Sequence, residues 1–237
     1  TVYVVADEFE QMEVLDAFLQ ANGPFRLHIL EQADFPKTLP PDTTAVIEFV
    51  HGQLSDAVAA TIMEYTLGGG RTLVIHHGLS SGKKRTKGWY KFLGVNLDAS
   101  PDCPHPYGWL HDVDFQLVNL QPNHYITSNH VVYSATATYR PSDTPSETQS
   151  LPALSFANSE VFINHQFTDG REKQVLFGFS FQHPQTGEVI QQDRSGWMKK
   201  KGRGWLFYLH PGHTVEDFKT LGYCQIIQNC LDWSPEK

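Results

Sequence analysis

Residues 68–78 read Gly-Gly-Gly-Arg-Thr-Leu-Val-Ile-His-His-Gly, a glycine turn followed by a short apolar run and a polar turn. The apolar run 72–75 predicts a buried strand, because it is short, apolar and bounded by turn residues. Before the glycines, apolar side chains recur at helical spacing over residues 54–62. Glycine commonly ends a helix with a left-handed backbone, so we expect a positive φ for at least one of residues 68–70. The stretch thus predicts a helix, a glycine cap and a strand, with two histidines placed where the strand ends.

The same alternation of strand and helix runs through the first third of the chain and returns near its C-terminus. Short apolar runs bounded by turn residues predict strands at 2–6, 26–30, 45–50, 72–75 and 205–209. An acidic segment after the first run opens a helical pattern that stops at Asn22-Gly23-Pro24, and one closing helix is expected over residues 215–233. Strands separated by helices predict an α/β fold with a mainly parallel sheet and helices on its faces.

The pattern changes between about residues 83 and 200, where proline, glycine and asparagine are frequent and no long helical period appears. Segments typical of β-strands lie at 113–120, 130–139, 160–167 and 174–181, and residues 142–152 are expected to form an exposed loop. Residues 196–201 and 205–209 flank a Lys-Gly-Arg-Gly turn as the two strands of a hairpin would. We interpret this part of the chain as a β-rich insertion.

Composition and charge exclude several classes of protein. The chain has 237 residues, 40% of them hydrophobic, which is typical of a folded domain rather than a disordered one. A net charge of −8 gives no electrostatic support for a nucleic-acid partner. Two basic runs, residues 83–87 and 199–203, are expected to be solvated loop tips, with an anion-binding lip as the alternative. No apolar run approaches the roughly 18 to 20 residues of a membrane span. The chain has three cysteines, an odd number that argues against a disulfide scaffold, so we expect a cytoplasmic protein.

Two turns that carry histidines follow two of the expected strands. His76 and His77 come after the strand at 72–75, and His210 and His213 come after the strand at 205–209. Ligands of open α/β sheets bind outside the carboxyl ends of the strands, so both turns could face one crevice. Imidazoles there could act as general acid, general base or metal ligands, while the alternative is structural hydrogen bonding to the backbone. The spacing of His210 and His213 also leaves a zinc site open, since imidazole is a preferred ligand of that ion.

Several short motifs in order give the chain a resemblance to a known family. The motifs are Gly-Gly-Arg-Thr-Leu-Val-Ile-His-His-Gly (69–78), Gly-Trp-Tyr-Lys-Phe-Leu-Gly (88–94), His-Asp-Val (111–113), Asn-His-Tyr-Ile-Thr (123–127), Gly-Arg-Gly-Trp-Leu-Phe-Tyr (202–208), Gly-His (212–213) and the ending at 229–233. Together they resemble the trehalose-utilisation (ThuA-like) family, which belongs to the class I glutamine amidotransferase-like superfamily. Over residues 1–237 the resemblance implies a single domain, a flavodoxin-like three-layer sandwich with the β-rich insertion at about 83–200.

The resemblance also implies a link to carbohydrate catabolism, where relatives act on 3-keto sugars or glycosides. It excludes amidotransferase chemistry, because that reaction needs a cysteine nucleophile on the turn that holds His76 and His77 here. The family's Asp-Glu-x-Tyr segment reads Ser159-Glu160-Val161-Phe162, which keeps only the glutamate.

We therefore expect a hydrolase or lyase acting on a keto-sugar or glycoside, with a non-catalytic sugar- or metal-binding domain as the alternative. The expected catalytic residues are His77, His213, His111 and Glu160; the expected substrate-binding residues are His76, Trp89, Tyr90 and His210; and the candidate ligands of a zinc ion are His77, His111 and His213. Trp89, Tyr90, Tyr107 and Trp109 could stack on a sugar face or simply pack in the core. The expected partner is a small carbohydrate, not nucleic acid or a membrane, and a homo-oligomer stays open.

Overall fold

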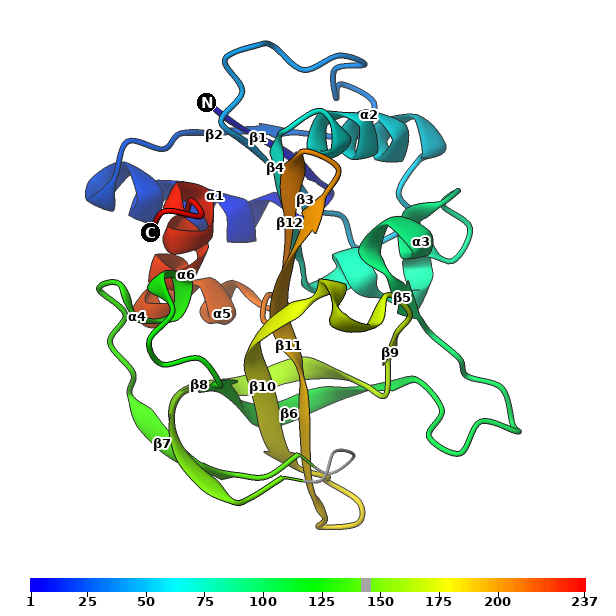
Figure 1. The fold of residues 1–237 in the computed structure, drawn as a ribbon, viewed down its shortest axis with the longest axis vertical. Coiled ribbons are helices and arrows are strands. Elements are labelled where there is room, and N and C mark those ends of the chain that lie inside the picture. The colour runs from blue at the N-terminus through cyan, green and yellow to red at the C-terminus, as the bar shows by residue number, and fades with distance from the viewer. Residues whose placement is uncertain (142–145) are drawn as a thin grey trace.

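Five parallel strands form one half of a ten-stranded sheet in the computed structural model, which describes residues 1–141 and 146–237 (Figure 1). They lie in the order β2 (Leu27–Leu30), β1 (Val2–Ala6), β3 (Ala45–Phe49), β4 (Arg71–Ile75) and β12 (Gly204–Leu209). Each pair of neighbours in this half is parallel. The five strands expected from the apolar runs are therefore confirmed, and together they make the parallel part of a mixed α/β fold.

Helices cover both faces of the parallel strands (Figure 1). One face packs against α1 (Phe9–Asn22), α5 (Val215–Lys219) and α6 (Leu221–Asp232), and the other packs against α2 (Asp56–Leu67) and α3 (Trp89–Leu93). Strand residues alternate between the two cores, as the period of a β-strand requires. Val4, for example, faces α1 and its neighbour Val5 faces α2.

The glycines before β4 end α2 as expected. The N-cap of the helix is Ser55, whose hydroxyl accepts a hydrogen bond from the backbone N–H of Val58. Gly69 has a φ of 122°, which confirms a left-handed glycine in the turn. The expectation of one closing helix over 215–233 is wrong, because Thr220 adopts an extended ψ of 97° and separates α5 from α6.

The second half of the sheet is antiparallel and lies below the parallel strands in Figure 1. Its strands are β11 (Val189–Lys201), β10 (Gln174–Gln182), β6 (Gly108–Asn119), β8 (Gln149–Ile163) and β7 (Ala135–Tyr139), in this order. The remaining short elements are η1 (His76–Leu79), η2 (Ser81–Lys83), β5 (Val95–Asn96), α4 (Tyr125–Ser128), β9 (Gln166–Phe167) and η3 (Gly170–Glu172). β11 pairs with β12 in the expected hairpin and so joins the two halves.

Three expectations about this half need correction. The strand expected at 130–139 begins only at Ala135, and the loop expected at 142–152 gives way to β8 from Gln149 onward. The strand expected at 160–167 is divided, because β8 ends at Ile163 and β9 pairs with β5 in a separate two-stranded sheet. Residues 142–145 lie outside the described part of the chain.

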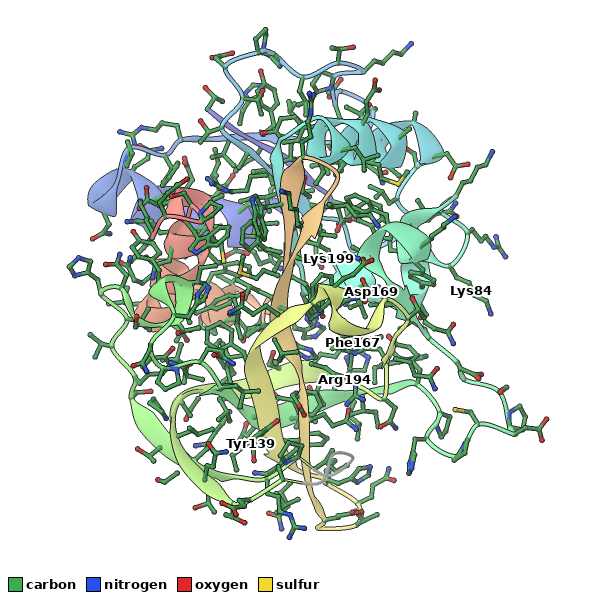
Figure 2. The ribbon with its side chains drawn as sticks, viewed as in Figure 1. Lys84, Tyr139, Phe167, Asp169, Arg194 and Lys199 are labelled. Atoms are coloured by element: carbon green, nitrogen blue, oxygen red, sulfur yellow. The ribbon has the colours of Figure 1, made fainter. Side chains whose placement is uncertain are left out.

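The two basic runs are not simply solvated. Lys83 and Lys199 are buried, whereas Lys84 and Lys200 are exposed. The Lys199 ammonium binds the carboxylate of Asp169, which also binds Lys173, and burial is tolerated because these charges are paired. Figure 2 shows Lys199 and Asp169 near the centre of the molecule and Lys84 at its rim. Among the described residues, no helix is long and apolar enough to span a bilayer.

Candidate functional site

The two histidine turns meet at one edge of the sheet. β4 and β12 are parallel neighbours, so the turns that follow them leave the sheet side by side. The rings of His76 and His77 have their centroids 5.5 and 5.7 Å from that of His213. The structure thus brings together the two turns that the sequence placed at equivalent strand ends.

Glu160 of β8 lies at the centre of these rings. Its Oε2 atom is 3.0 Å from Nε2 of His76, 3.0 Å from Nε2 of His77 and 3.4 Å from Nδ1 of His213. Its Oε1 atom is 3.4 Å from Nδ1 of His111. The Glu160 side chain is only 3% exposed. We call these five residues the Glu160 centre.

The β-rich insertion delivers Glu160 and His111 to this position. β6 and β8 pair as far as Leu110 and Val161, and the register then shifts. Asp112 and Asn158 have positive φ values of 55° and 51° at this irregularity, and both are residue types that tolerate the left-handed region. Such bulges bend a strand pair and re-aim its side chains. The bend brings this end of the pair over the histidine turns.

The hydrogen bonds of His76 define which of its nitrogens carries a proton. Its Nδ1 atom lies 2.7 Å from the backbone carbonyl oxygen of His210, which can only accept, so Nδ1 is the donor. Burial lowers the pKa of His76 well below its usual value, so the ring is neutral. The Nε2 lone pair therefore faces an oxygen of Glu160 at 3.0 Å. Two lone pairs at this distance repel each other unless a proton or a cation lies between them.

The donor atoms of the Glu160 centre fit a small divalent cation. In tetrahedral zinc sites with bonds of about 2.0–2.1 Å, neighbouring ligand atoms lie about 3.4 Å apart. Four ligand atoms, one each from His76, His77, His213 and Glu160, all lie within 4.8 Å of one another. The three histidine nitrogens lie 3.0–3.4 Å from Oε2 of Glu160. Imidazole and carboxylate are also the ligand types that zinc accepts. The set differs from the one expected from sequence, because His76 and Glu160 join His77 and His213 while His111 lies at the other carboxylate oxygen.

The histidines of the centre keep the Glu160 carboxylate ionised although it is buried. Burial alone would raise the pKa of Glu160, but hydrogen bonds from His213 and His77 outweigh it and hold the pKa well below its usual value. The bond to Glu160 raises the pKa of His213, while burial lowers the pKa of His77. The carboxylate therefore stays negatively charged among the imidazoles, as a metal ligand or an electrostatic partner of His213 must.

Three other residues expected to bind substrate lie behind the turn. Trp89 and His210 are completely buried. The Trp89 indole N–H donates to the carbonyl of Gly78 at 2.8 Å, and the Tyr90 hydroxyl donates to that of Ser80 at 2.8 Å. His210 accepts a hydrogen bond from His76 through its backbone carbonyl, so all three residues contact the turn after β4. They therefore hold the histidines of the Glu160 centre in position instead of facing a substrate.

Sequence reasoning missed several residues that hold the two turns. The buried Lys83 ammonium donates to the carbonyl of His77, and the ring of His51 stacks on that of His77 with centroids 3.8 Å apart. One carboxylate oxygen of Asp217 accepts hydrogen bonds from the backbone N–H groups of Gly212 and His213. Only Asp217 had a local signal, since Thr214 and Asp217 have the spacing of a capping box.

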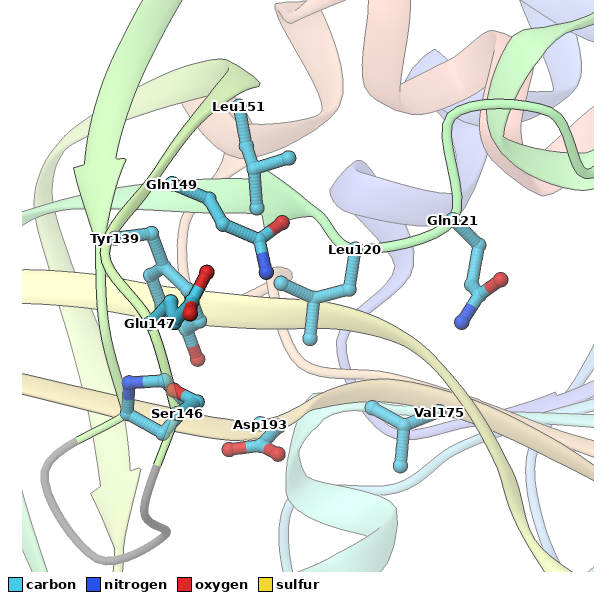
Figure 3. A pocket seen from close by; sticks show the side chains of 10 residues that line it. Leu120, Gln121, Tyr139, Ser146, Glu147, Gln149, Leu151, Val175 and Asp193 are labelled. Carbon is cyan, nitrogen blue, oxygen red and sulfur yellow. The ribbon is translucent and has the colours of Figure 1, made fainter.

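A separate hollow lies at the far end of the antiparallel strands (Figure 3). It has a volume of about 250 Å³ and is lined mostly by Leu120, Leu151, Val175, Tyr139, Glu147 and Asp193. None of its described lining residues is a histidine. We therefore place the candidate site at the Glu160 centre.

Comparisons with known proteins agree with this fold. A family model described as trehalose utilisation matches residues 3–234. A ThuA-like protein from Parabacteroides merdae superposes with a TM-score of 0.65 at 12% identity, covering 100% of this chain and 91% of that one. A ThuA-like protein from Bacteroides uniformis gives 0.63 at 14% identity, with coverage of 97% and 88%. A cytoplasmic protein from Salmonella typhimurium gives 0.57 at 15% identity, with 98% of both chains covered. The sequence has no significant match among curated proteins.

Proposed function

Because the chain belongs to the trehalose-utilisation family, we propose that it is an enzyme of carbohydrate catabolism, a hydrolase or lyase that acts on a keto-sugar or glycoside at the Glu160 centre. The observation that carries this proposal is the convergence of three imidazole nitrogens on one oxygen of a buried carboxylate. Buried ionisable groups gathered at the carboxyl ends of strands are typical of a catalytic site. Amidotransferase chemistry is not proposed, since the turn after β4 carries His76, His77 and Gly78 where a cysteine would be needed.

Within this proposal, His76, His77, His213 and Glu160 hold a zinc ion. When bound, the ion would act as a Lewis acid toward a sugar oxygen or toward water. His111 lies beside this set and its side chain is 53% exposed. With Nδ1 directed at Glu160, its Nε2 atom is free to exchange a proton with a bound sugar, which is the role of a general acid or base. His213, whose pKa is raised by Glu160, is the second candidate for proton transfer if the centre works without metal.

A non-catalytic metal- or sugar-binding domain is the second candidate. The observation that favours it is the count of protein ligands, because four protein ligands are typical of closed, structural zinc sites. Catalytic zinc sites usually have three protein ligands and one open position. The two functions differ in turnover rather than in zinc binding.

The rest of the proposal concerns the scaffold and its location. We take residues 1–237 as one domain of flavodoxin-like type with a β-rich insertion, supported by the strand order β2-β1-β3-β4-β12 and by the unbroken pairing through β11. We place the protein in the cytoplasm, supported by its three free cysteines.

Metal binding and turnover test the proposal together. Zinc is titrated into chelator-stripped protein by calorimetry, and trehalose, methyl glucosides and their 3-keto derivatives are screened for turnover with and without chelator. We expect wild-type protein to bind one zinc ion, and Glu160→Gln and His213→Ala to weaken binding by about a hundredfold or more. His28→Ala, an exposed histidine on the edge strand β2, is the matched control and should bind as wild type does.

Each outcome has a defined meaning. Turnover that needs zinc and is lost in Glu160→Gln supports the metal-assisted enzyme, and turnover that resists chelator but is lost in His213→Ala supports acid–base catalysis without metal. Zinc binding without turnover of any sugar in the screen supports the binding domain. Unchanged turnover in both variants would overturn the assignment of the site.

A further inference from the structure

Trp109 is an exposed indole next to the Glu160 centre. Its side chain is 52% exposed, and it lies two residues before His111 on β6. Residues i and i+2 of a strand lie about 7 Å apart. Phe162, the register partner of Trp109, contacts His77, and His111 contacts His213, so Trp109 and His111 border the same centre.

Buried aromatic rings hold this indole in place. Trp109 pairs in register with Phe162 of β8, whose ring stacks on His76 with centroids 4.8 Å apart. The ring of Tyr107 lies 6.2 Å from Trp109 and 6.4 Å from Phe162, and both Tyr107 and Phe162 are buried. A row of aromatic rings thus runs from the centre to the surface and ends in Trp109.

Single exposed apolar side chains are ordinary on protein surfaces, so exposure alone says little. The other exposed large apolar side chains in the described part of the chain are aliphatic and come from other elements: Leu67, Val132, Val189 and Leu221. Trp109 differs from them because it is a flat ring, it is supported by two further rings, and it adjoins a cluster of ionisable groups.

Partly exposed polar side chains border the centre beyond Trp109. The ring of His111 lies 5.4 Å from that of His213, which lies 5.7 Å from that of His77. His51 stacks on His77 and binds the carboxylate of Glu8 at 3.2 Å. His111, His51 and Glu8 all remain accessible to solvent. The surface therefore combines one flat apolar platform with a border of hydrogen-bond donors and acceptors.

We propose that Trp109 is the platform on which the apolar C–H face of a pyranose ring stacks. A pyranose presents C–H bonds on its face and hydroxyl groups around its rim, so it matches an indole beside a polar border. The distance of about 7 Å from Trp109 to His111 is roughly the span of one sugar ring with its substituents, which places a ring carbon at the Glu160 centre. This inference rests on the proposed function, and it adds that the sugar binds as a pyranose with one C–H face on Trp109.

Fluorescence quenching tests the platform, because Trp109 is the most accessible of the five tryptophans. Trp89 and Trp197 are completely buried, Trp233 is 7% exposed and Trp205 is partly buried. We expect trehalose and methyl α-glucoside to protect the emission from acrylamide, and the acyclic polyol sorbitol to give no protection. Trp109→Ala should abolish the protection and raise the Kd or KM by about tenfold with little change in kcat, and Trp109→Phe should restore most of the affinity. Trp205→Phe is the control, since Trp205 packs on Trp233 instead.

The experiment separates this inference from the proposed function. Glu160→Gln should still be protected by trehalose even where turnover is lost, and protection without any turnover would leave the platform standing while the enzyme proposal fails. Unchanged sugar affinity in Trp109→Ala would overturn the platform while leaving the Glu160 centre untouched. A change from oligomer to monomer in Trp109→Ala on gel filtration would also overturn it, because the indole would then belong to a subunit interface.

Discussion

The Nζ atom of Lys83 donates a hydrogen bond to the backbone carbonyl of His77 at 2.9 Å, from a side chain that is completely buried. The same ammonium donates to the carbonyl of Val50 at 2.5 Å and lies 3.7 Å from a carboxylate oxygen of Glu48. Val50 follows β3 and His77 follows β4, so this one side chain ties two neighbouring strand ends together behind the Glu160 centre.

Lys83→Met should therefore destabilise the fold strongly. The substitution keeps most of the side-chain volume but leaves two buried carbonyls and Glu48 without their partner, at a cost of about 3–5 kcal/mol in the free energy of unfolding. Urea denaturation measures this, with Lys84→Met as the control, because Lys84 is exposed at the rim of the molecule (Figure 2). Equal stabilities of the two variants would contradict the role assigned to Lys83.

Gly78 is the second residue that fixes the turn after β4. A Cβ atom at this position would lie 2.0 Å from Oε2 of Glu48 and 2.4 Å from Cγ1 of Val74. Gly78→Ala should cost about 2 kcal/mol or more and weaken zinc binding, because relief of the overlap displaces His77. The control is Gly108→Ala, whose Cβ would meet its nearest neighbour, a side-chain atom of Ile163, at an ordinary 3.7 Å. A Gly78→Ala protein as stable as the control would show that the turn adjusts freely.

Glu48 should make the stability of the protein depend on pH. Burial raises the pKa of Glu48 to about 7, although Lys83 opposes the shift. Between pH 4.5 and 7 the folded protein then keeps a proton that the unfolded chain has released. The free energy of unfolding should therefore fall as pH rises through this range, by up to about 3 kcal/mol, and level off above it. Glu48→Gln should flatten this slope in urea denaturation from pH 5 to pH 8, and the same slope in both proteins would refute the assignment.

Much of the parallel half of the sheet could be predicted from local sequence. Runs such as 2–6 and 72–75 are short, apolar and bounded by turn residues, and these features act over a few residues only. The break at Thr220 could not be predicted in the same way. The apolar stripe of α6 continues the pattern of α5, so no change in spacing marks the extended backbone at Thr220.

The candidate site was predictable in part for the same reason. The histidine turns follow recognisable strands, so their meeting follows from the topology of a parallel sheet. Glu160 was included only through the family resemblance, since its approach depends on a bend at Asn158 that no local pattern indicates. Lys83 was misjudged because its neighbours in the sequence are solvated, and its burial depends on a pairing with Glu48 that lies far away in the chain.

The three cysteines give a test of whether the site depends on histidine and glutamate rather than on a cysteine nucleophile. Burial raises the pKa of Cys224 to about 12 and also raises the pKa of Cys230, and the Cys224 thiol donates to the carbonyl of Phe218. Thiolates react and thiols do not, so both residues of α6 should be inert toward thiol reagents in the native protein. Cys103 is partly exposed and should be the one cysteine that reacts.

Titration with Ellman's reagent should accordingly count one thiol in the native protein and three after unfolding, and Cys103→Ser should remove the native signal. Alkylation of Cys103 should leave zinc binding and turnover unchanged, because Cys103 belongs to the insertion and not to the turn after β4. Inactivation by iodoacetamide that persists in Cys103→Ser would point to a cysteine nucleophile and would contradict a site built on histidine and glutamate.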